Sequence, residues 1–501
     1  MLSNTLQLAA GALLIAVPVG GFLGLMFART EVWGRRVAML FLGGLLLVPH
    51  YLQAAAWQAG FGVEGWQTSL QAGGLRVPWL DGWRGAIWVH GCAGIPWVAL
   101  FTGVAARSIP RTWEESALLD LSVAHVFVRV TLRSVLPALV LGALWVAIAT
   151  MAEMSVTDLF AVRTYTEELY IELNAGSWNA IMGVGLAHEG PVPAAAGILV
   201  TAIIAVAGLV LAHGLTSAAP RPSSGPPFVF SLGRWSLPLT LITWCFISAV
   251  VLLPLGSLIY KAGALVTQTD LGFERGWSAW KTIAMTFSSP LDHPSEFRWS
   301  LIMASCTASV TLLVAVPLAY ATRTSRFAGL VALALAVGGL AVPGPLLSLG
   351  LIPVFNDPEW PWLNYLYDRT IAVAVLAQAT RAFPLAFFLA WCGLRTIPQS
   401  HLEAAQLDGA GPLKRVWLAV RERPAAVALA ALAAFVISLG ELAATILVAP
   451  PGIEPLSVRI FGLLHYNVED QVAAISLMLI LLHAAATWVV LAAGRRVFRI
   501  G

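Results

Sequence analysis

The sequence predicts an all-α, polytopic helical membrane protein, and its composition and the length of its apolar runs support this class. Of the 501 residues, 58% are apolar and only 11% are charged, and the mean hydropathy is +0.81. In a soluble domain roughly a quarter of all residues are usually charged, and they cover its surface. The apolar residues fall in runs of about 20, which is the length of a helix that crosses a bilayer.

The apolar runs predict about 11 transmembrane helices. In chain order they cover residues 5–27, 37–58, 85–105, 137–158, 190–213, 237–260, 300–321, 328–352, 371–393, 425–447 and 471–493.

The distribution of basic residues predicts the orientation, because Lys and Arg are retained on the cytoplasmic side. One set of connections carries 19 Lys or Arg against 7 Asp or Glu, and the opposite set carries 9 against 16. The basic set consists of 28–36, 106–136, 214–236, 322–327, 394–424 and the C-terminal tail. We therefore expect a periplasmic N-terminus and a cytoplasmic C-terminus. No basic residue precedes Arg29, which argues against a cleaved signal peptide.

An internal repeat organises the chain. Residues 107–120 align with residues 395–408 at an offset of 288, and the same offset superposes Glu153 on Glu441. One register held across several helices indicates a duplication. Because the repeat unit spans six helices, both copies keep the same orientation, unlike the inverted repeats of many secondary transporters.

The two predicted halves are unequal. Residues 1–215 form a first half of five helices, 216–236 a cytoplasmic linker, and 237–501 a second half of six helices. The leading helix of the second half has no counterpart in the first.

Each half places a polar segment on the predicted cytoplasmic face. In the second half, Glu403, Ala404 and Ala405 form a favourable helical turn, with the acid near the positive end of the helix dipole. Asp408 and Gly409 follow, and a glycine there permits a tight reversal of the chain. The pattern predicts a short helix that projects from the membrane and can dock in a groove of another protein.

The corresponding segment of the first half departs from this pattern. Glu115, Ala117 and Asp120 match, but Ser116 replaces an alanine and Leu121 stands where the glycine is expected. We expect this first segment to bind its partner less tightly.

The paired segments resemble the EAA loop of binding-protein-dependent ABC importer permeases, whose short coupling helix fits a cleft on the ATP-hydrolysing subunit. The resemblance implies two ATP-binding subunits on the cytoplasmic side, a periplasmic substrate-binding protein, and a place in the lipid of the inner membrane. It also implies a transport subunit without a cofactor of its own, because ATP is bound by the partner. In agreement, the chain lacks the phosphate-binding G-x-x-x-x-G-K-[ST] motif. The sequence indicates no catalytic residues, no metal site and no nucleic-acid partner.

Two features of the sequence indicate which group of these permeases the chain resembles. Two fused halves occupy one chain of 501 residues, and the segments that begin at Glu153 and Glu441 are similar to a Glu-Leu-x-x-Thr pattern. Both resemble the ferric-iron permeases and their thiamine-type relatives. The resemblance implies import of a small solute by alternating access, with ferric iron as the first choice and thiamine or another solute as an alternative.

Five polar residues are candidates for the transport pathway or its outer gate: Glu153, Thr157, Asp158, Glu441 and Thr445. An acid at the bilayer centre costs roughly 2.5–3.5 kcal/mol on insertion scales, so it normally faces a cavity or a partner. Glu153 and Glu441 either line the outer mouth of the pathway, or contact the binding protein there, or form hydrogen bonds to neighbouring helix ends. In a different class of mechanism, a secondary transporter, these two residues would carry the coupling protons.

Pro49 and Pro343 occupy matched spans and predict a kink in each, because proline removes a helical hydrogen bond. Arg381, inside another predicted span, either pairs with an acid in the membrane or extends toward the interface.

Overall fold

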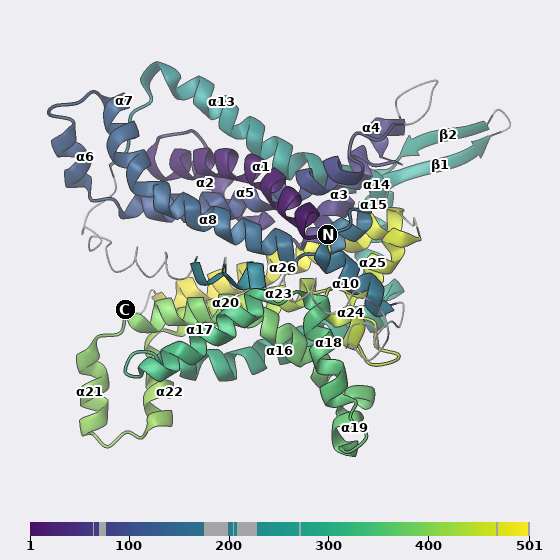
Figure 1. The fold of residues 1–501 in the computed structure, drawn as a ribbon. Coiled ribbons are helices and arrows are strands. Elements are labelled where there is room, and N and C mark those ends of the chain that lie inside the picture. Colours follow the sequence, from purple (N-terminus) through teal and green to yellow (C-terminus); the bar gives the residue numbers. More distant parts are fainter. Residues whose placement is uncertain are drawn as a thin grey trace. The chain divides into compact units, whose positions relative to one another are not determined.

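The computed structural model is helical except for one β-hairpin among the residues that it describes (Figure 1). These residues are 1–63, 65–69, 77–174, 199–203, 205–207, 228–269, 272–466 and 469–498. They divide into two compact units. The first contains the chain up to Ile171 and again from residue 199 to Thr282, and the second is formed mainly by the chain from Ile283 onward. The predicted class of helical membrane protein is confirmed.

The first unit contains most of its residues in long helices joined by short helical segments. Its elements are α1 (Leu2–Arg29), α2 (Arg35–Leu45), α3 (His50–Phe61), α4 (Trp66–Ser69), α5 (Gly82–Ser108), α6 (Arg111–Ala117), α7 (Val123–Val126), η1 (Phe127–Leu132), α8 (Arg133–Ala152), α9 (Ser155–Leu159), α10 (Tyr165–Asn174), η2 (Gly233–Trp235), α13 (Ser236–Ile247), η3 (Ser248–Leu252), α14 (Leu253–Gly263), and the antiparallel strands β1 (Ala264–Thr269) and β2 (Gly272–Trp277).

Helix α15 (Ala279–Asp292) leads into the second unit. The elements of that unit are α16 (Pro294–Ala321), α17 (Arg326–Ala341), α18 (Gly344–Phe355), α19 (Pro361–Arg369), α20 (Ala372–Arg395), α21 (Gln399–Leu407), α22 (Pro412–Glu422), α23 (Pro424–Gly440), α24 (Thr445–Val448), α25 (Leu456–His465) and α26 (Glu469–Phe498).

Within the described residues, seven helices are long and apolar enough to cross a membrane, and the count rises to ten if each of three bent helix pairs is one span. The predicted span 190–213 lies largely outside the described residues. The count of eleven therefore stays a prediction.

The prolines that predict kinks begin new helices instead. Pro49 is the N-cap of α3 and Pro343 is the N-cap of α18. The chain bends by 107° between α2 and α3 and by 111° between α17 and α18. Proline suits a helix start because its missing N–H is not needed there, and it disfavours a helical conformation in the residue before it. Val342 accordingly is extended.

Arg381 on α20 supports the break before α18. Its guanidinium donates hydrogen bonds to the carbonyl oxygens of Gly339 (3.0 Å) and Val342 (3.1 Å), at the end of α17. These oxygens lack helical partners once the helix stops, so the arginine satisfies them inside an apolar region. Neither of the two roles expected for Arg381 describes these contacts, because its observed partners are backbone carbonyls and not an acid.

Each unit has a core of three long helices that pack through small residues. In the first unit α1 packs on α5 and α8, and an added Cβ at Gly20 or Gly24 would lie 2.7 Å from a backbone oxygen of α5. In the second unit α16, α20 and α23 pack through alanines such as Ala386 and Ala434. Small residues permit the close backbone approach on which membrane helix packing depends. The three packed helices of each unit correspond to matched spans of the predicted repeat.

The compact units do not follow the predicted division of the chain at residue 237. Residues 237–282, assigned from the sequence to the second half, pack within the first unit. Trp244 of α13 donates a hydrogen bond to the carbonyl of Trp33 (3.1 Å), and Trp66 of α4 donates to Ser257 of α14 (3.1 Å). The leading helix of the second half is therefore part of the first unit's structure.

Candidate coupling helices and intramembrane carboxylates

Helix α21 forms the first arm of a hairpin that projects from one end of the second unit (Figure 1). Pro398 is its N-cap, and the helix ends at Leu407 with Asp408 as C-cap. Gly409 has a φ of 76°, the left-handed conformation that a helix end often requires. The amide of Ala410 then donates to the carbonyl of Ala405 (2.9 Å), which closes the turn before α22. The predicted role of Gly409 agrees with this geometry.

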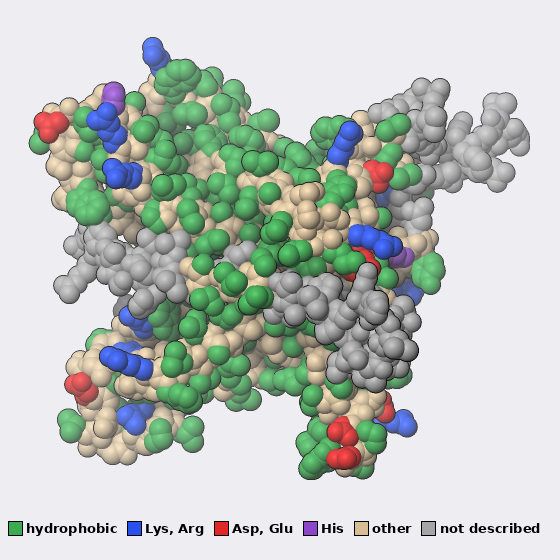
Figure 2. Space-filling view, in the orientation of Figure 1, with side chains coloured by type: hydrophobic (Ala, Val, Ile, Leu, Met, Phe, Trp, Pro, Cys, Tyr) green, Lys and Arg blue, Asp and Glu red, His purple; other side chains and the backbone are tan. Residues whose placement is uncertain are grey.

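The candidate residues of α21 lie at the surface of the hairpin. Glu403, Ala404, Asp408 and Gly409 are exposed and Ala405 is half-buried, whereas Leu402 turns toward the core. Leu407, at the tip, is 89% exposed. Lys and Arg side chains gather on the same projection (Figure 2).

Helix α6 is the corresponding element of the first unit. Glu115 and Asp120 are exposed and Ala117 is half-buried. Leu121 does not need the conformation of a glycine, because Ala161 is the one non-glycine residue with positive φ in the described chain. Instead the amide of Leu121 donates to the carbonyl of Ala117 (2.9 Å) and closes the turn.

An exposed leucine marks the tip of both hairpins. Leu119 is 86% exposed, and the offset of 288 that relates the two repeats places it on Leu407. The two segments thus share an exposed apolar position as well as the acidic and alanine positions.

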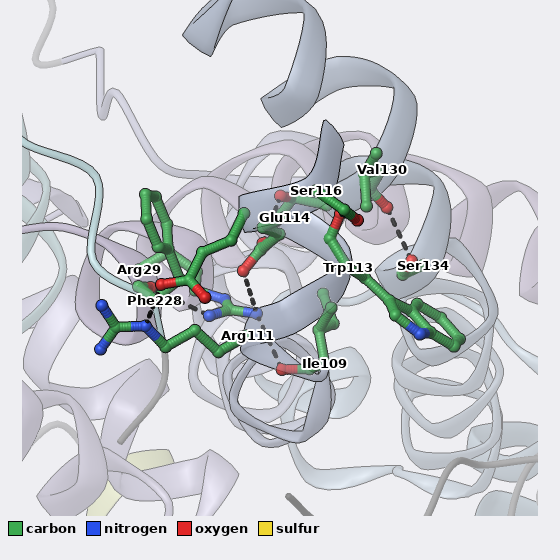
Figure 3. Close-up of polar contacts among 11 residues, drawn as sticks. Arg29, Ile109, Arg111, Trp113, Glu114, Ser116, Val130, Ser134 and Phe228 are labelled. Atoms are coloured by element: carbon green, nitrogen blue, oxygen red, sulfur yellow. Dashed lines mark hydrogen bonds and ion pairs between the residues drawn. The ribbon is translucent and has the colours of Figure 1, made fainter. Parts of the chain in front are cut away.

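Glu114 of α6, which the sequence patterns did not indicate, forms a buried ion pair. The carboxylate of Glu114 lies 3.1 Å from the guanidinium of Arg29, and both side chains are fully buried (Figure 3). The hydroxyl of Thr131 donates a hydrogen bond to Glu114 (2.7 Å). Burial raises the pKa of Glu114, and the hydrogen bond from Thr131 and the charge of Arg29 oppose that rise. The repeat contains a signal for it, because Leu402, at the matching position of the second repeat, marks that position as buried. An acid at position 114 therefore needs a buried partner.

Arg29 also contacts two backbone carbonyls. Its guanidinium donates to Phe228 (2.9 Å) and to Ile109 (3.4 Å), the residue before the N-cap of α6 (Figure 3). In the second unit Arg323 donates to the matching Ile397 (2.8 Å) and also to Leu394. Each unit thus uses an arginine near the end of its first core helix to hold the chain that enters the coupling helix.

Glu153 and Glu441 each end one helix and begin the next. The carboxylate of Glu153 accepts hydrogen bonds from the amides of Ser155 (2.7 Å) and Val156 (3.0 Å), at the start of α9. That of Glu441 accepts from the amides of Ala444 (2.9 Å) and Thr445 (3.0 Å), at the start of α24. These contacts correspond to the second interpretation from the sequence, hydrogen bonds to neighbouring helix ends. They also end the predicted spans 137–158 and 425–447 early, at Ala152 and Gly440.

Glu441 joins a buried polar network in the second unit. The hydroxyl of Thr445 donates to Glu441 (2.6 Å) and accepts a hydrogen bond from the amide of Gln378 (3.0 Å). The carbonyl of Gln378 accepts from Thr307 (2.9 Å) and Ser438 (2.5 Å). Every hydroxyl and amide here has a partner, as a polar group in an apolar interior requires.

The first unit differs at the matching positions. Ser155, and not Thr157, donates its hydroxyl to Glu153, while Thr157 donates to the carbonyl of Met154 (2.9 Å). The position of Gln378 is occupied by His90, whose ring nitrogen lies 3.7 Å from the carboxylate of Glu153. Asp158 is half-buried on α9 and is not one of the residues that form hydrogen bonds with Glu153. Among the described residues, no group of three or more His, Cys, Asp or Glu is arranged to hold a metal ion.

The comparisons with known proteins bear on the second repeat. Residues 311–499 match the model of the binding-protein-dependent transport system inner membrane component. This segment includes α21, α22 and, except for Thr307, the residues of the Glu441 network. No curated protein matches the chain. Over residues 311–499 the chain is therefore similar to the inner membrane components of binding-protein-dependent transport systems, a family of multi-pass transport subunits of ABC importers and not of enzymes.

Proposed function

We propose that this chain forms the whole translocation path of an ABC importer, with α6 and α21 each docking one of two ATP-binding subunits. The observation that supports this most directly is the pair of leucines, Leu119 and Leu407, exposed at matched positions on two projecting hairpins. Closure of the ATP-binding subunits would move both hairpins and reorient the helices that carry them. A periplasmic substrate-binding protein would deliver the cargo while the path faces outward.

The proposed docking surface combines an apolar contact with charged neighbours. Burying an exposed leucine stabilises a complex by roughly 1.5–3 kcal/mol. Glu403 and Asp408 lie beside Leu407, and Glu115 and Asp120 lie beside Leu119, so basic residues on the partner would complement both tips. The first tip lacks the alanine and the glycine of the second, so we expect the second to bind its partner more tightly.

The docking proposal is tested by Leu407→Asp and Leu119→Asp, purified in detergent after co-expression with the ATP-binding subunit of the same importer. We expect Leu407→Asp to lose most of the bound subunit and Leu119→Asp to lose less. Val77→Asp, at an exposed apolar residue of a predicted periplasmic connection, is the matched control and should retain full binding. Retention of the subunit by the Leu119→Asp plus Leu407→Asp variant would contradict the proposal.

The proposed cargo is ferric iron, on the resemblance of the fused two-half organisation to ferric-iron permeases. Uptake of radiolabelled ferric iron is measured in cells with the intact chain, with a deletion, or with Glu403→Lys plus Gly409→Asp. We expect uptake to be lost in both altered strains while the variant chain remains in the membrane. Equal iron uptake in all three strains would refute iron as the cargo, and the same strains would then be assayed with thiamine.

The same strains test the mechanism of energy supply. We expect uptake to stop when the ATP-binding subunit is deleted and to continue briefly when a protonophore collapses the membrane potential. The opposite result would favour a secondary transporter in which Glu153 and Glu441 carry protons. The contacts of both carboxylates with backbone amides favour a structural role at a helix start instead.

A further inference from the structure

We propose that Arg29 and Glu114 form a positioning pair that fixes the first coupling helix on the end of α1 and transmits its displacement to the segment that enters α13. This inference rests on the proposed docking role of α6. The pair is fully buried, its charged atoms are 3.1 Å apart, and it joins residues from two separate elements of the first unit.

Helix α6 needs such an anchor because little else fixes its orientation. It has seven residues, too few to be stable alone, and it lacks the glycine that caps α21. Its other ion pair, Arg111 with Glu115 at 2.6 Å, is about half exposed and lies within the helix itself. An exposed pair of this kind contributes at most a few tenths of a kcal/mol.

The second coupling helix is held differently. Leu402 occupies the position of Glu114, so no buried ion pair is formed there. Instead α21 contacts α22 through His401 with Glu422 (3.1 Å) and Gln406 with Arg415 (3.1 Å). The two repeats therefore orient their coupling helices by different means, one by a buried ion pair and the other by exposed contacts across a hairpin.

The chemistry of arginine suits a junction between several segments. The Arg29 guanidinium reaches the carboxylate of Glu114, the carbonyl of Ile109 at the entry to α6, and the carbonyl of Phe228. A planar fork of five donors can hold three acceptors at once, whereas a lysine ammonium has three rotating donors on a flexible stem. Removing one member leaves the other charge buried without compensation, which is strongly unfavourable.

The junction extends beyond the guanidinium to the chain that precedes α13. The amide of Phe230 donates to the backbone carbonyl of Arg29 (2.8 Å), and Thr30 forms a parallel bridge with Phe230. Helix α13 begins a few residues later, at Ser236. A shift of Glu114 with α6 would therefore act on the end of α1 and on the entry to α13 together.

The test compares Glu114→Gln and Arg29→Lys with Glu31→Gln in the complex with the ATP-binding subunit. Glutamine at 114 keeps the size of the side chain and the acceptor for Thr131 but removes the charge. Lysine at 29 keeps the charge but loses the fork, and it covers the case in which Glu114→Gln does not fold. Glu31 is the matched control, because it is an exposed acid beside Arg29 that accepts one hydrogen bond, from the amide of Leu232.

Three quantities are measured: the affinity for the ATP-binding subunit, the ATP turnover per bound subunit, and hydrogen exchange of the amides in 111–122 and 228–231. A positioning pair predicts unchanged affinity, since the exposed tip is intact, and a turnover lowered roughly five- to tenfold. Hydrogen exchange in these two segments should accelerate roughly tenfold or more in both variants and in neither segment of Glu31→Gln.

The outcomes separate this inference from the docking proposal. Unchanged turnover and unchanged exchange in both variants would overturn the inference. The inference is also overturned if membrane-inserted protein, affinity and total turnover fall together while the turnover per bound subunit stays normal. The pair would then only stabilise the fold. If Leu119→Asp and Leu407→Asp fail to release the ATP-binding subunit, the docking proposal itself fails, whatever the result at Arg29 and Glu114.

Discussion

At the scale of single residues, two buried acids of the described chain, Glu114 and Glu441, are stable because each has donors aimed at it. Glu441 receives two backbone amides and a hydroxyl, and Glu114 receives a guanidinium and a hydroxyl. Amides converge at the start of a helix, where they have no helical acceptors and where the helix dipole favours a negative charge. The position of an acid relative to a helix end therefore decides whether it can remain charged in an apolar region.

Glu441→Ala should lower the stability of the chain, because it leaves two amides and a threonine hydroxyl at the start of α24 without their acceptor. The expected cost is about 1–3 kcal/mol. Glu441→Gln keeps one acceptor and should fall between wild type and alanine. The measurement is the thermal unfolding midpoint in detergent, with the exposed Glu454→Ala as control. Equal midpoints for Glu441→Ala and Glu454→Ala would show that the capping contacts contribute nothing.

Glu167 on α10 should make stability depend on pH. Its pKa is raised to about 7, chiefly by burial and also by the charges of Asp158 and Glu168, while Arg163 and the backbone of Thr164 oppose the rise. Because the folded state holds the proton more tightly than the unfolded state, the stabilisation is complete below about pH 4.5 and is lost as the pH rises through about 7.

As the pH is raised from 4.5 to 7.5, the thermal unfolding midpoint of the wild type should accordingly decrease relative to that of Glu167→Gln. The decrease should be equivalent to at most about 3 kcal/mol. Glutamine cannot titrate, so the difference between the two proteins isolates this residue. A constant difference across the pH range would mean that Glu167 does not titrate there.

At the scale of elements, local backbone rules explain where the coupling helices end. Gly409 has positive φ, whereas Gly411, two residues later, has a φ of −65° that any residue adopts. An added Cβ would meet nothing within 4 Å at either position, so a difference between them can arise only from the backbone.

Gly409→Ala should therefore destabilise the end of α21 by about 1–2 kcal/mol, the cost of the left-handed conformation for a residue with a side chain. Gly411→Ala should be neutral or slightly stabilising. Hydrogen exchange of the amides in 399–410 measures both variants. Faster exchange in Gly411→Ala than in Gly409→Ala would contradict the backbone explanation.

Features that depend on neighbouring residues in the chain could be predicted from the sequence, whereas features that depend on contacts between distant residues could not. The turn at Gly409 depends on neighbours in the chain, and the sequence indicates it. At Pro49 and Pro343 the sequence indicates a distorted helix, but not that a new helix begins at each proline. The prediction of kinks was wrong in extent, because a complete break also needs distant donors such as Arg381 for the freed carbonyls. The pairing of Arg29 with Glu114 depends on the packing of α1 against α5, and no local pattern reveals it.

At the scale of the whole molecule, the charge distribution predicts the orientation in the membrane, and single cysteines can test it. In a background without the four native cysteines, Asp408→Cys should react with a membrane-impermeant maleimide only when the cytoplasmic side is opened. Asp357→Cys, in the connection before α19, should react in intact spheroplasts. Asp408 is exposed and Asp357 is half-buried. The reverse pattern of labelling would invert the predicted topology.

The packing of α13 and α14 within the first unit has a consequence for how the protein is made. When the ribosome has finished the predicted linker at residue 236, the first unit still lacks the helices that supply the partners of Trp33 and Trp66. Its early helices must therefore wait in the membrane, accessible to insertion factors, until the chain has been translated through β2. A gene split to express the protein as two polypeptides should accordingly be divided after Trp277 and not within 216–236.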